Sequence, residues 1–306
     1  MYFPYFRGRQ YELLALRELL QNDLLSKKVI PVIEPVKLSS TFIGTLQSFT
    51  DKDHHTALIL NPQVGEFDDK EALKVFIPYI NREIIPAIIM NDDTDAALQE
   101  ISSNSIQLSD LLVVLQNQDF VEDYARLLDS ITPQYTLFPD ERKIRRVVQN
   151  GKVLFENRFR KCEKNADYLK NQDEFYSDDH LFYEEEGYSG FGDYSIIGEK
   201  YDESGFAPRA VAIHMVYFDD TDALRIHHFV SDSNIGIEDV AGKFYEAVSK
   251  LKEWFSNCPK KQYTAALATL IDFAEKGYYP GLPTLKKLSI MHHMEIISKY
   301  LDGGVQ

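Results

Sequence analysis

The chain has 306 residues, of which 44% are hydrophobic and 26% are charged. These proportions are close to those of folded globular proteins, so they argue against a largely disordered chain. The formal net charge of −15 disfavours unspecific binding to nucleic acid or to anionic lipid, because both are negatively charged. Binding to nucleic acid would therefore require a local basic patch.

The cysteines and the lengths of the apolar runs bear on the cellular location of the protein. Cys162 and Cys258 are the only cysteines, and they do not have the spacing of a disulfide framework or a zinc site. The first residues lack the apolar core and cleavage site of a secretory signal. No apolar run is long enough to span a bilayer. We therefore expect a cytoplasmic protein without a membrane partner.

Apolar strands alternate with amphipathic helices through the first half of the chain. A first helix is predicted at residues 10–25, where leucines recur at helical spacing. The predicted strands that follow cover residues 29–36, 56–60, 84–90, 110–115, 134–138 and 152–155. The predicted helices between them cover residues 40–49, 69–79, 94–101, 119–129 and 140–149. Such alternation is typical of parallel βαβ units.

Two further strands would complete a ring of eight. We predict them at residues 190–198 and 210–218. The expected fold is therefore α/β, a (β/α)8 barrel of TIM-barrel type that forms a single domain over residues 1–306. An open parallel α/β sheet is the alternative.

The last third of the chain extends this barrel. Residues 224–231 follow a turn at 219–222, so we expect a β-hairpin with the preceding strand. Three C-terminal helices are predicted at residues 237–255, 263–276 and 284–301.

A polar residue follows nearly every predicted parallel strand. These residues are Glu34, Asn61, Asn91, Gln116, Asp140 and Asn157. The carboxyl ends of the strands form the mouth of a βα barrel, where active sites lie, so these side chains are candidates for ligand binding. Each also fits a helix cap or a turn, because Asn and Asp favour those positions. Among them, Glu34 is a candidate catalytic residue, and Asn61 and Asn157 are candidates for substrate binding.

The segment from residue 183 to residue 234 combines acids, glycines, tyrosines and histidines. Asp193 lies on a predicted strand between Gly192 and Tyr194. A glycine at this position permits close approach of a ligand, although it also fits a simple bulge. We therefore expect Asp193 to be catalytic and Tyr194 to contact the substrate.

Two histidines of the same segment are candidates for proton transfer or metal binding. His214 and His228 are chosen because histidine titrates near neutral pH. A core histidine whose ring nitrogen is satisfied by a backbone carbonyl is the alternative. His227 and His228 must point to opposite sides of a strand, so only one of them can join His214 and Asp193.

Cationic residues suggest how an anion would be bound. Arg7 and Gly8 precede the first helix, whose N-terminal N–H groups and dipole attract phosphate. The alternative is a solvated loop packed under Tyr2, Phe3 and Tyr5. Lys287 is a second candidate phosphate ligand. Residues 142–164 form a basic block that fits either a phosphate contact or the solvated face of a helix and a loop. A divalent metal ion is possible, but no motif spacing identifies its ligands.

An acidic and aromatic segment follows the basic block. Residues 165–190 read as an insertion in the barrel, with acids interleaved with Phe and Tyr. Such a segment is typical of a lid or of a loop that docks a protein partner.

Four stretches of the chain resemble the bacterial and phage beta-protein family. They are the opening YFPYFRGRQYELLALREL, the middle block DEFYSDDHLFYEEEGYSGFGDYSIIGEKYDESGFAPRAVAIHMVYF, the phrase LRIHHFVSDSN and the ending YPGLPTLKKLSIMHHMEI. The likeness covers nearly the whole chain. It implies an association with mobile or phage-defence gene neighbourhoods, and so a protein partner from a defence operon, but it implies no catalytic residues.

The motifs exclude some enzyme classes and leave two functions. No GxGxxG precedes a helix, and neither a P-loop nor a GxSxG motif is present, which weighs against dinucleotide enzymes, P-loop NTPases and α/β-hydrolases. We expect a hydrolase or lyase acting on a phosphate-containing substrate, a nucleotide or nucleic acid. The alternative is a non-catalytic sensor or adaptor that binds a protein partner. The sequence does not indicate the oligomeric state.

The enzyme hypothesis assigns a role to each candidate. The general bases or metal ligands are Glu34 and Asp193, the proton carriers are His214 and His228, and the phosphate ligands are Arg7 and Lys287. The hypothesis requires Glu34, Asp193 and His214 to share one cavity.

Overall fold

A computed structural model describes residues 1–67, 71–128, 131–202, 208–259 and 262–303. The chain divides into two compact units, each built from three separate stretches. Unit 1 consists of Met1–Leu13, Lys27–Asn157 and Asp179–Tyr194. Unit 2 consists of Leu14–Ser26, Arg158–Asp178 and Ser195–Gln306. The first boundary falls within helix α1 (Gln10–Gln21), so this helix contributes residues to both units.

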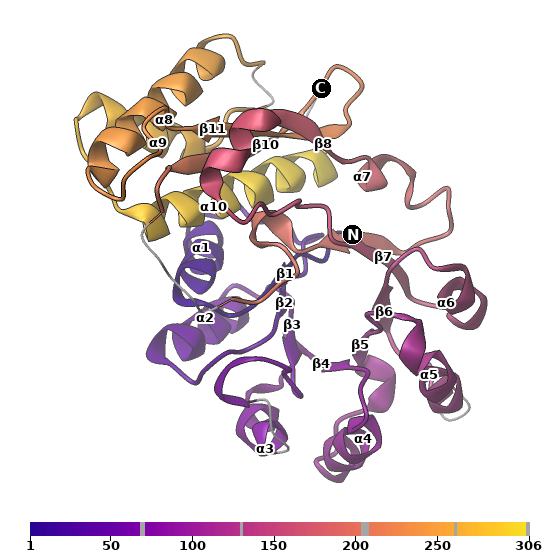
Figure 1. Cartoon of the computed structure of the whole chain (residues 1–306). Coiled ribbons are helices and arrows are strands. Elements are labelled where there is room, and N and C mark those ends of the chain that lie inside the picture. The colour runs from indigo at the N-terminus through magenta and orange to yellow at the C-terminus, as the bar shows by residue number, and fades with distance from the viewer. Residues whose placement is uncertain (68–70, 129–130, 203–207, 260–261, 304–306) are drawn as a thin grey trace. The chain divides into compact units, whose positions relative to one another are not determined.

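Unit 1 contains an eight-stranded parallel sheet. Its strands, in spatial order, are β1 (Tyr5–Phe6), β2 (Val32–Ile33), β3 (Thr56–Ile59), β4 (Ile84–Ile89), β5 (Leu112–Val114), β6 (Tyr135–Phe138), β7 (Lys152–Glu156) and β9 (Gly190–Asp193). Tyr2 joins the two ends, because it forms parallel bridges to both Val29 and Phe191. The sheet is a nearly closed barrel, so the predicted TIM-barrel-like (β/α)8 fold is confirmed (Figure 1).

Helices surround this barrel (Figure 1). They are α2 (Ser40–Asp51), α3 (Ala72–Phe76), α4 (Thr94–Ser103), α5 (Val121–Leu128), α6 (Arg142–Val147) and the single turn α7 (Asp179–Phe182). Helix α2 begins where Ser39 caps it, with the Ser39 hydroxyl accepting a hydrogen bond from the Phe42 N–H. Asp69, Lys70 and Asp129, which belong to two predicted helices, lie outside the described residues.

One predicted barrel strand is wrong, although the number of strands is right. Residues 212–218 form β10 (Ala212–Phe218), which belongs to an antiparallel sheet in unit 2 and not to the barrel. The eighth barrel position is occupied by β1, a strand of two residues at the start of the chain. A strand this short shows no periodicity, so the sequence pattern does not reveal it.

Glycine makes room for aromatic side chains inside the barrel. Tyr5 packs against Phe155 with ring centroids 5.8 Å apart. A Cβ atom at Gly192 would lie 2.4 Å from the Phe3 carbonyl oxygen and 3.0 Å from the Phe155 ring. Gly192 therefore lies on the face of the sheet where Tyr5 and Phe155 pack, which is the barrel interior. Gly190 lies on the same face, because residues two apart on a strand point to the same side. No larger residue fits at Gly192 without moving the neighbouring strand.

We expect Gly192→Ala to lower the free energy of unfolding by about 1–3 kcal/mol, because the added methyl group overpacks the interior. Urea denaturation would measure this change. Gly277→Ala is the matched control, since a Cβ there meets nothing within 4 Å and the φ of +63° alone is unfavourable. The control should cost about 1 kcal/mol. Wild-type stability for Gly192→Ala would contradict the predicted clash.

Unit 2 combines a three-stranded antiparallel sheet with three helices. The strands, in spatial order, are β10 (Ala212–Phe218), β11 (Leu224–Val230) and β8 (Asp173–Ser177), and the helices are α8 (Val240–Ser256), α9 (Ala265–Glu275) and α10 (Leu282–Leu301). The predicted hairpin is confirmed, because Phe218 pairs with Leu224 across the turn. Helix α10 contacts β10 and α9, whereas α8 contacts β11 and α9. The sheet is therefore covered by helices.

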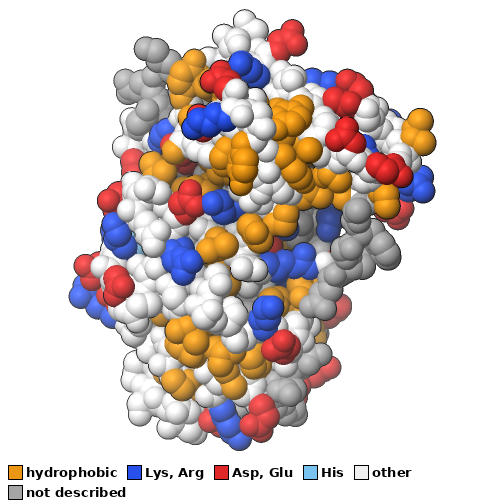
Figure 2. Space-filling view, turned by 90° about the vertical axis from the view of Figure 1, so that its left-hand side faces the viewer, with side chains coloured by type: hydrophobic (Ala, Val, Ile, Leu, Met, Phe, Trp, Pro, Cys, Tyr) orange, Lys and Arg blue, Asp and Glu red, His pale blue; other side chains and the backbone are white. Residues whose placement is uncertain are grey.

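The surface carries both signs of charge. Figure 2 shows a face on which acidic and basic side chains are interspersed, with patches of hydrophobic side chains in its upper and lower parts. This face is therefore not a continuous basic surface of the kind that binds nucleic acid. Among the described residues, no helix has both the length and the apolar character needed to cross a bilayer.

Candidate functional site

Arg7 and Glu34 form a buried ion pair at the carboxyl ends of β1 and β2. The Glu34 side chain is fully buried, and Arg7 is only 8% exposed. The Arg7 guanidinium contacts Glu34 Oε2, and the Tyr5 hydroxyl donates to the same oxygen at 2.7 Å. The Gln63 N–H donates to the other oxygen, Oε1, at 2.7 Å. Both carboxylate oxygens are hydrogen-bonded, as a charged group in a protein interior requires.

The same surroundings keep Tyr5 protonated and Arg7 charged. Burial, followed by the negative charge of Glu34, raises the pKa of Tyr5 well above its usual value. Burial by itself would lower the pKa of Arg7, but the interactions with Tyr5 and Glu34 outweigh it and raise the pKa. The Arg7 guanidinium also lies 5.6 Å from the ring centroid of Tyr194, within the range of a cation–π contact.

The predicted substrate ligands of unit 1 have separate environments. The Asn61 carboxamide extends the β3–β4 ladder, because it donates to the Ile89 carbonyl and accepts from the Ile89 N–H, each at 2.8 Å. Asn157 follows β7 and is exposed. Tyr194 is buried, and its ring centroid lies 4.8 Å from that of Phe155. Only Asn157 is openly accessible from solvent.

Asp193 and Glu34 project from opposite faces of the barrel sheet. Asp193 accepts a hydrogen bond of 2.8 Å from the Tyr2 hydroxyl. It follows Gly192, which faces the barrel interior, so Asp193 points outward. Glu34 instead contacts Tyr5, whose ring lies inside the barrel. The structure therefore does not bring these two carboxylates into one cavity, and His214 belongs to unit 2.

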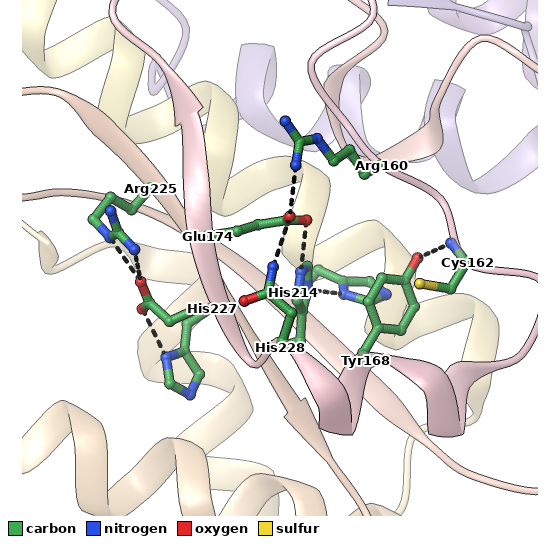
Figure 3. Close-up of polar contacts among 10 residues, drawn as sticks. Arg160, Cys162, Tyr168, Glu174, His214, Arg225, His227 and His228 are labelled. Carbon is green, nitrogen blue, oxygen red and sulfur yellow. Dashed lines mark hydrogen bonds and ion pairs between the residues drawn. The ribbon is translucent and has the colours of Figure 1, made fainter.

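In unit 2, His214 and His228 face each other across β10 and β11 (Figure 3). Their Nδ1 atoms are 2.8 Å apart. Nε2 of His228 lies 3.4 Å from Oε1 of Glu174 on β8, and Glu174 lies 3.7 Å from the guanidinium of Arg160. The three strands thus place Glu174, His228 and His214 in a row, which we name the histidine relay.

Hydrogen bonding determines the tautomers of the histidine relay. A carboxylate only accepts hydrogen bonds, so Nε2 of His228 carries the hydrogen that points to Glu174. The neutral His228 ring then has its lone pair on Nδ1, and Nδ1–H of His214 donates to it. The lone pair of His214 is therefore on Nε2, which has no hydrogen-bond partner among the described residues. His214 also lines a pocket of about 230 Å³.

Burial keeps both rings neutral at neutral pH. Burial, followed by the nearby His228 and Lys286, lowers the pKa of His214 to about 3. Burial also lowers the pKa of His228, although Glu174 opposes this change. The neutral rings agree with the tautomers that the hydrogen bonds require.

The pocket beside His214, named the His214 pocket, combines apolar walls with cations. Its apolar lining includes Phe159, Tyr168, Ile196, Ile197, Leu282 and Leu285. Its polar lining includes Lys161, Cys162, Asn165, Lys286 and Ser289. The Tyr168 ring packs against both histidines, with centroids 4.7 Å from His214 and 4.4 Å from His228. The volume lies below the range of about 300–1,000 Å³ for drug-sized ligands, so the pocket encloses only part of a ligand of nucleotide size.

Lys287, the other predicted phosphate ligand, and His292 of α10 have partners elsewhere in unit 2. Lys287 donates to Glu18 of α1 at 2.5 Å. The ring of His292 contacts the Thr264 hydroxyl and the Val216 carbonyl, each at 2.8 Å. None of these groups lines the His214 pocket.

The acidic and aromatic segment is partly structural. Asp173–Ser177 forms β8 and pairs with β11, so Glu174 belongs to the histidine relay and not to a lid. Phe182, which is 44% exposed, and the exposed residues 184–186 follow later in the segment. Only this later part keeps the predicted role as a docking loop.

No protein-family model, curated protein or solved structure matches the chain. The resemblance to the beta-protein family stays a prediction. Within the described part of the chain, no group of three or more His, Cys, Asp or Glu side chains is arranged to hold a metal ion.

Proposed function

We propose that the chain is a hydrolase or lyase that acts on a phosphate-containing substrate in the His214 pocket. The histidine relay is the observation that carries this proposal, because it leaves an accepting Nε2 on His214, a residue that lines the pocket. A histidine oriented through its other ring nitrogen is a typical general base. His214 would accept a proton from water or from a substrate hydroxyl. His228 and Glu174 would then stabilise the imidazolium that forms.

The lining of the pocket supports an anionic substrate with a flat ring. Lys161 and Lys286 supply positive charge, and a phosphate group attracts such ammonium groups. Phe159 and Tyr168 supply aromatic surface on which a nucleotide base could stack. A nucleotide is therefore the substrate class that fits both parts of the lining.

Substrate binding would raise the basicity of His214. With a pKa of about 3 in the free pocket, the ring is a weak base at neutral pH. A bound phosphate adds negative charge beside His214 and opposes the effect of Lys286, which raises the pKa of the histidine. His214 would therefore accept protons readily only when the pocket is occupied. Proton uptake on binding is the expected consequence.

Unit 1 would have a structural role in this proposal. Glu34 is held by Arg7, Tyr5 and Gln63, and Asp193 points away from the barrel interior. We therefore propose that these carboxylates stabilise the barrel. The resemblance to the beta-protein family adds phage defence as the proposed biological setting.

The test measures turnover of a panel of nucleoside mono-, di- and triphosphates. Released phosphate and released base are the two readouts. With the best substrate, His214→Gln should lower kcat by about 10²–10⁴-fold, because general-base catalysis is lost. Lys286→Gln should instead raise KM by about tenfold, because one charge–phosphate contact is lost. The melting temperature of each variant should stay close to that of the wild type.

The surface variant Lys252→Gln is the matched control, because its partner Glu275 lies away from the pocket. It should leave kcat and KM unchanged. Full activity of His214→Gln on every substrate that the wild type turns over would refute the proposal, as would a wild type that neither binds nor converts any member of the panel.

A further inference from the structure

A second pocket of unit 2 is lined by aromatic rings that the proposed reaction does not use. It has a volume of about 540 Å³, and its lining includes Tyr217 of β10, His227 of β11 and Trp254 of α8. We name it the Trp254 pocket. His227 and His228 are neighbours on a strand and point to opposite faces, so this pocket and the histidine relay lie on different faces of the sheet.

One carboxylate holds two of these rings in place. The Tyr217 hydroxyl donates to Asp173 Oδ2 at 2.7 Å, and Nδ1–H of His227 donates to the same oxygen at 3.0 Å. Arg225 donates to Oδ1 at 2.7 Å and balances the charge of Asp173 (Figure 3). The Trp254 ring stands at 72° to that of Tyr217, with centroids 5.4 Å apart. The rings are thus fixed walls at a large angle to each other, as in an aromatic cage.

Acidic side chains also line the pocket. Asp219, Asp220 and Glu253 contribute three carboxylates. Lys250 also lines the pocket, but its ammonium group lies 2.8 Å from the carboxylate of Asp232. The carboxylates therefore exceed the cation that faces them.

Local hydrogen bonds keep Asp219 ionised and in position. Its Oδ1 atom accepts from the N–H and the hydroxyl of Thr221, at 2.8 and 2.7 Å, and from the Ala223 N–H at 3.2 Å. Burial would raise the pKa of Asp219, but these hydrogen bonds outweigh it and lower the pKa. The charge at this wall of the pocket is therefore fixed before a ligand arrives.

We propose that the Trp254 pocket binds a linear alkyl polyamine. Ammonium groups are attracted both to the faces of Trp and Tyr rings and to carboxylates. Several ammonium groups along one chain match the carboxylates spread over the lining, and the methylene groups between them match the ring surfaces. In its neutral form His227 adds an accepting Nε2, because its Nδ1–H donates to Asp173.

Tryptophan fluorescence gives a direct test, because Trp254 is the only tryptophan in the chain. Spermidine, titrated at low salt into the full-length protein, should cause a saturable change in emission. Neither 1,8-octanediol, an uncharged chain of similar length, nor magnesium chloride at equal ionic strength should reproduce it. No saturable response to spermidine would overturn the proposal. An equal response to magnesium would also overturn it, since the site would then be an unspecific cation cluster.

Variants separate the two kinds of contact, with binding measured by titration calorimetry. Trp254→Leu should raise the Kd for spermidine about tenfold through loss of the cation–π contact. The double variant Asp220→Asn, Glu253→Gln should raise it by at least tenfold through loss of two charges. Glu275→Gln removes a carboxylate that is outside the pocket and should leave the Kd unchanged. Equal weakening by this control would overturn the assignment to the Trp254 pocket.

Discussion

Replacing Arg7 by methionine is expected to lower the free energy of unfolding by about 3–5 kcal/mol. The variant keeps a side chain of similar length but leaves the carboxylate of Glu34 without its cation. Glu34 is fully buried, so water cannot compensate for the lost partner. Urea denaturation at neutral pH, followed by circular dichroism, would measure the loss.

A second substitution tests whether the uncompensated charge is the cause. Arg7→Met combined with Glu34→Gln removes the charge and should recover a large part of the lost stability. The carboxamide oxygen can accept from the Gln63 N–H, and the carboxamide NH2 group can donate to the Tyr5 hydroxyl oxygen. Lys276→Met breaks a solvated ion pair with Asp272 and should cost less than about 1 kcal/mol. A cost for Arg7→Met as small as that of Lys276→Met would show that the pair does not stabilise the barrel.

Stability is expected to fall as the pH drops from about 6.5 towards 4. The pKa of His292 is lowered to about 3, first by burial and then by His293 and Lys299, although its bond to the Val216 carbonyl opposes this. An unfolded histidine titrates near 6.5, so between the two values the unfolded chain binds more protons. The contribution of His292 is therefore complete above about pH 6.5 and is lost during acidification. Its slope is about 1.4 kcal/mol per pH unit.

The comparison of slopes isolates this contribution. Free energies of unfolding at pH 7, 6, 5 and 4.5 should fall less steeply for His292→Gln than for the wild type, by up to about 1.4 kcal/mol per pH unit. His214→Gln should flatten the curve in the same direction, since its pKa is also about 3. The exposed His55→Gln is the control and should run parallel to the wild type. Parallel curves for all variants would contradict the predicted linkage.

The sequence predicted the barrel because its strands are apolar runs that alternate at regular intervals with helical patterns. The prediction was wrong at two strands. Strand β1 has only two residues, which is too short to show an alternation of apolar and polar side chains, and β10 is an apolar run that resembles a barrel strand. The predicted hairpin contained the information needed to correct β10. A strand that pairs antiparallel with its successor through a tight turn fits a separate sheet better than a parallel barrel.

The candidate site was predictable in part. Phe218 pairs with Leu224 around the turn, and counting outward from this pair places His214 opposite His228. This register comes from the structure. The predicted turn at residues 219–222 would pair Phe218 with Ala223 and place His214 opposite His227, so the sequence alone does not choose between the two histidines. Glu174 could not be found in this way, because β8 pairs with β11 across about fifty residues and no local pattern specifies such a pairing. Tyr168 and Lys286 also come from distant segments.

The interleaving of the two units affects how the chain can form and how it can be divided. Unit 1 needs Tyr194 and unit 2 begins again at Ser195, while earlier stretches of unit 2 lie between those of unit 1. During synthesis the barrel cannot be completed until nearly two thirds of the chain has been made. Strand β8 is synthesised well before its partner strand β11. No single cut of the polypeptide can release either unit whole.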